Sequence, residues 1–158
     1  DRQALLNTEN GCLLCLEDVQ DPGNLGTMMR TAEGAGMTAL VLTKNCVDLF
    51  NPKVVRSTMG ALFRVPFYLC DNLTDEVDEL KKEGFTTYAA HLKGDRDYTE
   101  PDYSGKAAIV IGNEARGITE ETAKKTDALV KIPMEGELES LNAAVSAALF
   151  MYEIHRKR

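Results

Sequence analysis

Three separated segments of the chain each place polar side chains or glycines directly after a short apolar run. The polar side chains that these segments carry are Asn24, Arg30, Glu114, Ser140 and Asn142. Such side chains bind and orient a ligand, but they include no obvious nucleophile and no set of metal ligands. In an open α/β sheet, the loops that follow the strands form a ligand site at the carboxyl ends of those strands. The segments therefore predict one binding site built from loops far apart in the sequence.

The sequences of the three segments are specific. The first is DPGNLG at Asp21–Gly26, with Arg30 about one and a half helical turns further on. The second is IGNEARGI at Ile111–Ile118. The third begins with IPM at Ile132–Met134 and ends with SLN at Ser140–Asn142. One such motif alone is weak support for a function, whereas three in this order and spacing are strong support.

The three motifs resemble those of the SpoU-type RNA ribose 2′-O-methyltransferases of the SPOUT class, and the resemblance extends from about Gly11 to Tyr152. It implies methyl transfer from S-adenosylmethionine to a ribose 2′-hydroxyl of rRNA or tRNA. It also implies a homodimer built largely around the last helix and a C-terminal trefoil knot. A cytoplasmic location is indicated separately by the cysteines. Many relatives carry a separate N-terminal RNA-binding domain, which we expect to be absent from these 158 residues.

The resemblance assigns cofactor binding to positions in the second and third motifs: Ile111, Gly112, Ile132, Met134 and Leu141. Leu92, at the end of another expected strand, is expected to form a further wall of the cofactor site. Gly112 follows an apolar run, and a residue without a Cβ lets a purine or ribose approach the backbone. Ile132 and Leu141 are expected to contact the adenine. Without the motif context, both would be interpreted as ordinary core residues.

The resemblance makes Arg30 the main candidate for catalysis. A guanidinium is a poor base, because its pKa lies above about 12. We therefore favour Arg30 as a cation that binds phosphate or stabilises the developing alkoxide, and the role of base stays open. Asn24 is expected to orient Arg30 or the ribose, or to cap a helix. Glu114 is expected to pair with Arg30 or Arg116, or to accept a hydrogen bond from the substrate.

Two further site residues flank Leu141. Ser140 is expected to cap the last helix, and Asn142 to supply an orienting amide. Ala144 stands where many relatives have a small hydroxyl residue, which is a departure from the family pattern.

Two other classes of protein remain as alternatives. One is a non-catalytic RNA-binding or ribosome-assembly module that keeps the fold, although the complete set of motif residues argues against it. The other is an unrelated nucleotide-binding α/β enzyme. The spacing of Gly23 and Gly26 does not match the G-x-G-x-x-G fingerprint, so a dinucleotide site is not indicated.

Length and composition indicate a single domain that needs no disulfide. Cys12 and Cys15 form an isolated C-x-x-C within an apolar run, which favours buried structural thiols in a reducing compartment. No apolar run is long enough to cross a membrane.

The formal net charge of −7 argues against a general nucleic-acid binder. A local basic face is nevertheless expected from Arg30, Lys53, Arg56 and Arg64.

The periodicity predicts an α/β fold with a mainly parallel, Rossmann-like sheet covered by helices on both faces. The expected strands are 12–17, 39–43, 65–69, 86–90, 107–111 and 128–132. The expected helices are 25–35, 52–62, 73–83, 119–125 and 141–155.

Three further segments carry expectations of their own. Residues 91–106 are expected to be irregular. The apolar stripe Leu141, Val145, Leu149 and Tyr152 of the last helix is expected either to pack on the sheet or to join a dimer. The basic tail 155–158 is expected to be solvated or near RNA.

Overall fold

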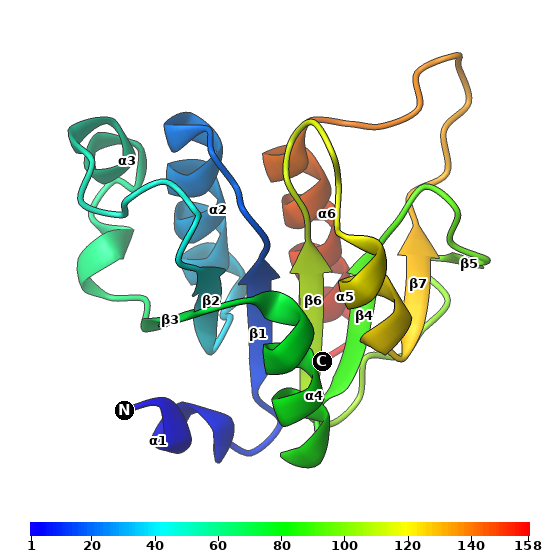
Figure 1. Ribbon diagram of the computed structural model, residues 1–158, viewed down its shortest axis with the longest axis horizontal. Coiled ribbons are helices and arrows are strands. Elements are labelled where there is room, and N and C mark those ends of the chain that lie inside the picture. The colour runs from blue at the N-terminus through cyan, green and yellow to red at the C-terminus, as the bar shows by residue number, and fades with distance from the viewer.

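In the computed structural model, which describes residues 1–158, seven parallel strands form one sheet (Figure 1). The strands are β1 (Cys12–Leu16), β2 (Ala39–Thr43), β3 (Phe67–Cys70), β4 (Thr86–Ala90), β5 (Arg96–Asp97), β6 (Ala107–Ile111) and β7 (Ala128–Lys131). Their order across the sheet is β3-β2-β1-β6-β4-β7-β5, and every neighbouring pair is parallel. The predicted fold class is confirmed.

Helices cover both faces of the sheet (Figure 1). They are α1 (Arg2–Leu6), α2 (Pro22–Ala35), α3 (Pro52–Ser57), the 3-10 helix η1 (Ala61–Phe63), α4 (Leu73–Lys82), α5 (Glu120–Lys125) and α6 (Ala143–Arg156). The larger apolar cluster joins the sheet to α2, α3, η1 and α6. The smaller cluster joins the opposite face of the sheet to α1, α4 and α5. Central strands β1, β2 and β6 are buried on both faces, which explains why they are apolar without alternation.

After the two neighbouring strands β1 and β6, the polypeptide passes to opposite faces of the sheet. After β1 it passes to α2 on one face, and after β6 it passes to α5 on the other face. The two connections diverge above the carboxyl ends of these strands (Figure 1). Such a switch point leaves a crevice where ligands bind in open α/β sheets.

Several elements differ from the sequence-based expectation. Helix α1 and the short edge strand β5 were not predicted, and β5 lies inside the segment 91–106 that was expected to be irregular. The helix expected over 52–62 ends at Ser57, because Met59 and Gly60 adopt positive φ angles of 52° and 89°. Strands β2, β4 and β6 have the predicted bounds, and the other boundaries move by at most three residues. The trefoil knot stays a prediction.

The C-terminal residues His155, Arg156 and Arg158 are exposed, as expected, but the tail is anchored by hydrogen bonds that the sequence did not predict. The Lys157 ammonium donates to the carbonyl oxygens of Thr99 and Pro101. The Arg158 guanidinium donates to the carbonyls of three residues at the amino-terminal edge of the sheet, Asn10, Tyr103 and Gly105. These contacts tie the end of α6 to the segment between β5 and β6.

The four cysteines carry free thiols, and Cys12, Cys15 and Cys70 are buried. Burial raises the pKa of Cys12 to about 11, so its thiol stays protonated at neutral pH. This agrees with the predicted structural role of Cys12 and Cys15. None of the helices is long and apolar enough to span a bilayer.

Candidate active site at the carboxyl edge of the sheet

One hydrogen-bonded chain joins a residue from each of the three motifs. The Asn142 Nδ2 donates to Asn24 Oδ1 at 3.1 Å, and the Asn24 Nδ2 donates to Glu114 Oε2 at 3.3 Å. Asn24 is separated in sequence from Glu114 by 90 positions and from Asn142 by 118 positions. The structure therefore confirms that the motif loops meet at one place, as the sequence predicts.

The two outer residues of this hydrogen-bonded series, Glu114 and Asn142, determine how the Asn24 amide is oriented. At one end, Asn142 Oδ1 accepts from the backbone N–H groups of Ala144 and Val145, so its Nδ2 must point toward Asn24. At the other end, an ionised Glu114 can only accept, so Asn24 must present its Nδ2 there. The oxygen of Asn24 is then left for Asn142. The orientation of the central amide is consequently determined by its two neighbours.

Glu114 forms no ion pair with Arg30 or Arg116 within this chain, so the first of its two expected roles is not found there. Its Oε1 accepts from the Gln20 backbone N–H at 3.0 Å, and its Oε2 accepts from the Asp21 N–H at 2.8 Å. Partial burial opposes ionisation, but these N–H donors and the Asn24 amide outweigh it and hold the pKa of Glu114 below its ordinary value. Glu114 is thus an ionised clamp between the first two motif loops and not a base.

The cap of α6 is Asn142, not Ser140 as expected. The helix begins at Ala143, and Ser140 is exposed in the preceding segment without a hydrogen bond from its side chain. The Asn142 amide therefore has two roles. Its oxygen caps α6, and one N–H holds Asn24, which leaves its second N–H free.

Asn24 is not the cap of its helix either. Asp21 caps α2, and its carboxylate accepts from the Asn24 backbone N–H at 2.9 Å. Pro22 then occupies the first turn, where its lack of an N–H costs nothing. Gly26, two positions beyond Asn24, allows α3 to approach, because a Cβ there would overlap Ser57. The first motif thus combines a helix start, an amide and a close helix contact.

Residues 112–118 form a tight loop. Asn113 and Gly117 exchange two backbone hydrogen bonds, and the Asn113 side chain donates to the Asp18 carbonyl at 2.8 Å. A Cβ on Gly112 would overlap the backbone of Gly117 and Ile118. Gly112 is therefore required by the loop itself, in addition to any ligand that it admits.

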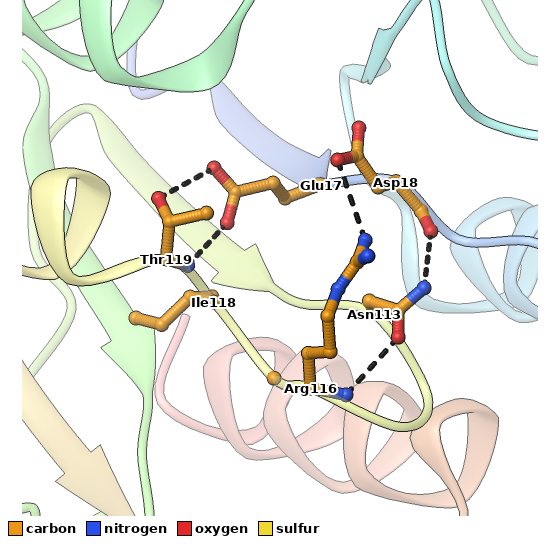
Figure 2. A pocket seen from close by; sticks show the side chains of 7 residues that line it. Glu17, Asp18, Asn113, Arg116, Ile118 and Thr119 are labelled. Carbon is orange, nitrogen blue, oxygen red and sulfur yellow. Dashed lines mark hydrogen bonds and ion pairs between the residues drawn. The ribbon is translucent and has the colours of Figure 1, made fainter.

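Glu17 secures the far end of this loop, and the sequence reasoning missed it. The side chain is buried, and its carboxylate accepts from the Thr119 backbone N–H at 2.7 Å and from the Thr119 hydroxyl at 3.2 Å (Figure 2). It also accepts from the Thr122 hydroxyl at 2.6 Å. Glu17 also lines a cavity of about 210 Å³, together with Asp18 and Arg116, which form an ion pair at 3.7 Å. A buried-strand pattern that ends in an acidic residue was the available signal.

Arg30, like Ser140, lies outside the hydrogen-bonded set Glu114, Asn24 and Asn142. Its side chain is exposed on α2 and makes no hydrogen bond or ion pair within the chain. A contact through which Asn24 would orient Arg30 is therefore not found within this chain.

The predicted cofactor residues lie at the ends of three adjacent strands, β6, β4 and β7. Ala90 of β4 pairs with Val130 of β7, so Leu92 and Ile132 each lie two residues beyond that pair. Leu92 is exposed, whereas Ile132, Met134 and Leu141 are half-buried. These side chains leave apolar surface accessible at the carboxyl edge.

Ile111 is more restricted than expected. Its side chain is buried in the core, and its carbonyl accepts from the Glu17 N–H at 2.9 Å. Any contribution of Ile111 to cofactor binding is therefore limited. No group of three or more metal-ligating side chains gathers at this edge or elsewhere in the structure.

Comparison with known proteins gives consistent matches. The model of the SpoU rRNA Methylase family matches residues 11–152. The 23S rRNA (guanosine(2553)-2′-O)-methyltransferase RlmP of Bacillus subtilis (strain 168) is 43% identical over 142 residues, which cover 90% of this chain and 57% of that protein.

Solved structures agree with the fold. The SpoU methyltransferase AviRb from Streptomyces viridochromogenes matches with a TM-score of 0.90 and 29% identity, over 100% of this chain and 63% of that one. An AdoMet-bound rRNA methyltransferase from Sinorhizobium meliloti matches with a TM-score of 0.88 and 33% identity, over 96% of this chain and 59% of that one. The chain thus spans less than two thirds of the length of these relatives.

Proposed function

The chain belongs to the SpoU rRNA methylase family, and we propose that it is the catalytic domain of an enzyme that methylates a ribose 2′-hydroxyl of rRNA or tRNA. The methyl donor in this proposal is S-adenosylmethionine. Because the chain covers 57% of the length of RlmP, we also propose that the complete enzyme carries a separate RNA-binding domain.

The observation that carries the proposal is the hydrogen-bonded chain Glu114–Asn24–Asn142. It aligns three polar groups from three loops beside the switch point between β1 and β6. A module that only kept the fold would have no need for an amide fixed at both ends. Ordering these loops costs conformational entropy, and positioning of reacting groups gives a catalytic advantage that offsets this cost.

The carboxyl edge fits S-adenosylmethionine. Leu92, Ile132, Met134 and Leu141 offer apolar surface for an adenine, and the 112–118 loop offers backbone groups for its polar edge. When bound, this cofactor supplies a methyl group that is activated by a sulfonium. The work of the protein is then to hold the ribose hydroxyl in line with that methyl group.

The chain's own polar residues have separate tasks in this proposal. The free N–H of Asn142 donates to a ribose oxygen. Asn24 and Glu114 act as positioning residues, because all their acceptor and donor contacts are directed to the loops. Arg30 supplies positive charge to the developing alkoxide or to the adjacent phosphate.

A homodimer explains the position of Arg30. The sheet-facing residues of α6 are Ala144, Ala147, Phe150, Met151 and Ile154. In contrast, Val145 and Tyr152 of the predicted stripe are 48% and 47% exposed, so packing of that stripe on the sheet was the wrong alternative. The Tyr152 side chain lies over Gly34 of α2, one turn after Arg30. Pairing of two protomers through this surface would place Arg30 at the interface, within reach of a partner's site.

The direct experiment is methyl transfer to RNA by the purified chain. RNA from cells that lack this protein is incubated with labelled S-adenosylmethionine and digested to nucleosides. The expected product is a 2′-O-methylnucleoside that forms with the wild type and is strongly reduced with Arg30→Ala. Methylation of a base instead of the ribose would contradict the proposal.

A further inference from the structure

Residues 49–70 differ in charge from the rest of the chain. They contain Lys53, Arg56 and Arg64 but no Asp or Glu, so all 25 acidic residues of this chain lie elsewhere. The segment comprises α3, η1 and β3 with their connections. A basic stretch in a chain of net charge −7 is a marked local asymmetry, which suggests an anionic partner.

Most basic side chains of the protein are already engaged by carboxylates or carbonyl oxygens. Arg64 belongs to this group, since it pairs with Glu33. The side chains with neither an ion pair nor a hydrogen bond are Arg30, Lys53, Arg56, Lys93, Lys124 and Lys131. Half of these free cations, Arg30, Lys53 and Arg56, lie on α2 and α3.

Helix α3 flanks the candidate site. It packs against the beginning of α2, where Gly26 meets Val54 and Ser57, and this part of α2 also carries Asn24. Figure 1 shows α3 beside α2 at the same end of the sheet as the motif loops. Lys53 and Arg56 therefore lie on the helix that packs against the site-bearing turn of α2.

Large apolar side chains are exposed around these cations. Phe50, Met59 and Phe63 are 65%, 66% and 79% exposed. An aromatic face accepts an unstacked base of any sequence, and neighbouring Lys and Arg residues neutralise its phosphates. This combination of free cations and aromatic rings is typical of surfaces that bind single-stranded nucleic acid.

We propose that the α3 shoulder, defined as Phe50, Lys53, Arg56, Met59 and Phe63, binds the single-stranded RNA next to the target nucleotide. Lys53 and Arg56 contact phosphates, and the two phenylalanine rings stack on unpaired bases. This inference rests on the proposed function, because it assigns the RNA-docking surface of the same site. Charge complementarity favours RNA over an apolar protein partner, since the free cations have no carboxylate beside them within the shoulder.

Fluorescence anisotropy with a labelled oligouridine of about 12 nucleotides tests the shoulder. The test variant is Lys53→Ala/Arg56→Ala. The matched control is Lys82→Ala/Lys124→Ala, which removes the same charge from α4 and α5 on the other face of the sheet. Alanine is a good helix former, so neither change should disturb folding.

The salt dependence gives the expected magnitude. Each phosphate contact with single-stranded nucleic acid contributes about 0.7 to the slope of log K against log salt concentration. Loss of two contacts should therefore reduce the slope by about 1.4 and weaken binding roughly 25-fold at about 0.1 M salt. The control variant should stay within about twofold of wild type. Phe63→Ser should weaken binding roughly 5-fold or more without changing the slope.

Two results would overturn the inference. The first is a test variant whose affinity and slope equal those of the control. The second is unchanged RNA binding together with a loss of self-association in sedimentation, which would assign the shoulder to a second copy of the chain. Calorimetry with S-adenosylhomocysteine separates this test from the proposed function. A shoulder defect leaves cofactor binding intact, whereas a failure of the wild type to bind the cofactor would count against the function alone.

Discussion

Replacement of Glu114 by glutamine is the sharpest perturbation of the site, because it changes one oxygen to an NH₂ group with almost no change in shape. The carboxylate accepts three hydrogen bonds, at 2.8, 3.0 and 3.3 Å, and two of the donors are backbone N–H groups that cannot turn away. In Glu114→Gln, one of these donors faces an NH₂ group and loses its acceptor. An NH₂ group in the Oε2 position also faces the Asn24 amide, whereas an NH₂ group in the Oε1 position is repelled by the Gln20 N–H and shifts the side chain that holds Asn24. Either orientation disturbs the bond from Asn142 to Asn24.

The magnitude follows from the hydrogen bonds. A bond to a charged acceptor contributes about 1.5–3 kcal/mol, and partial exposure of Glu114 favours the lower end of that range. We expect kcat/KM to fall roughly 10- to 100-fold, because about 1.4 kcal/mol corresponds to a factor of ten. Single-turnover methyl transfer is the assay, with Glu135→Gln as control, since Glu135 is exposed and makes no side-chain hydrogen bond.

The pH dependence provides a second test of the same residue. Because the pKa of Glu114 is depressed in the folded protein, its stabilising contribution is complete above the ordinary glutamate pKa of 4.5 and is lost as the pH falls through the lowered value. Wild-type activity between about pH 6 and 9 should therefore show no titration of Glu114. Equal activity of Glu114→Gln and Glu135→Gln would refute the clamp, and a rate that rises with ionisation of Glu114 would make it a base.

Further changes test other parts of the site. Arg30→Ala should lower the rate of methyl transfer by about 10²–10³ while S-adenosylhomocysteine still binds in calorimetry, and Arg30→Lys should restore it only in part. Normal turnover of Arg30→Ala at saturating RNA would remove Arg30 from the catalytic group. Gly112→Val should abolish cofactor binding, because its Cβ overlaps the Gly117 backbone, and calorimetry with unchanged affinity would contradict this. Val145→Glu should convert a dimer to a monomer of about 17.4 kDa in sedimentation, whereas an unaffected dimer would move the interface elsewhere. Cys12 should resist thiol reagents at neutral pH until the protein unfolds, since burial raises its pKa to about 11, and rapid labelling of the native protein would argue against that burial.

The sequence predicted those parts of the fold whose signals are local. Strands such as β1 and β6 are continuous apolar runs of five residues, and their burial on both faces leaves little ambiguity. Strand β5 has two residues and exists only because Arg96 and Asp97 lie beside β7, so no periodicity could reveal it. The early end of α3 depends on the positive φ of Met59, which a non-glycine residue rarely adopts.

The site divides in the same way. Residue types and motif order predicted that Asn24, Glu114 and Asn142 would meet, but not which atom of each would face the next. Those pairings depend on competition for acceptors. Asp21 caps α2, so the Asn24 side-chain amide is available for other bonds. The Glu114 carboxylate accepts from the backbone N–H groups of Gln20 and Asp21 and forms no ion pair with an arginine. Arg30 has no partner within this chain, and its place in the site depends on the proposed homodimer.

The central claim is methyl transfer to a ribose hydroxyl at the carboxyl edge of this sheet. The most direct measurement is mass spectrometry of nucleosides from RNA treated with the wild-type chain and labelled S-adenosylmethionine, beside Glu114→Gln and Glu135→Gln. We predict that the wild type and Glu135→Gln form a labelled 2′-O-methylnucleoside, and that Glu114→Gln forms much less of it. Label on a base, or a ribose product formed equally by all three proteins, would contradict the account.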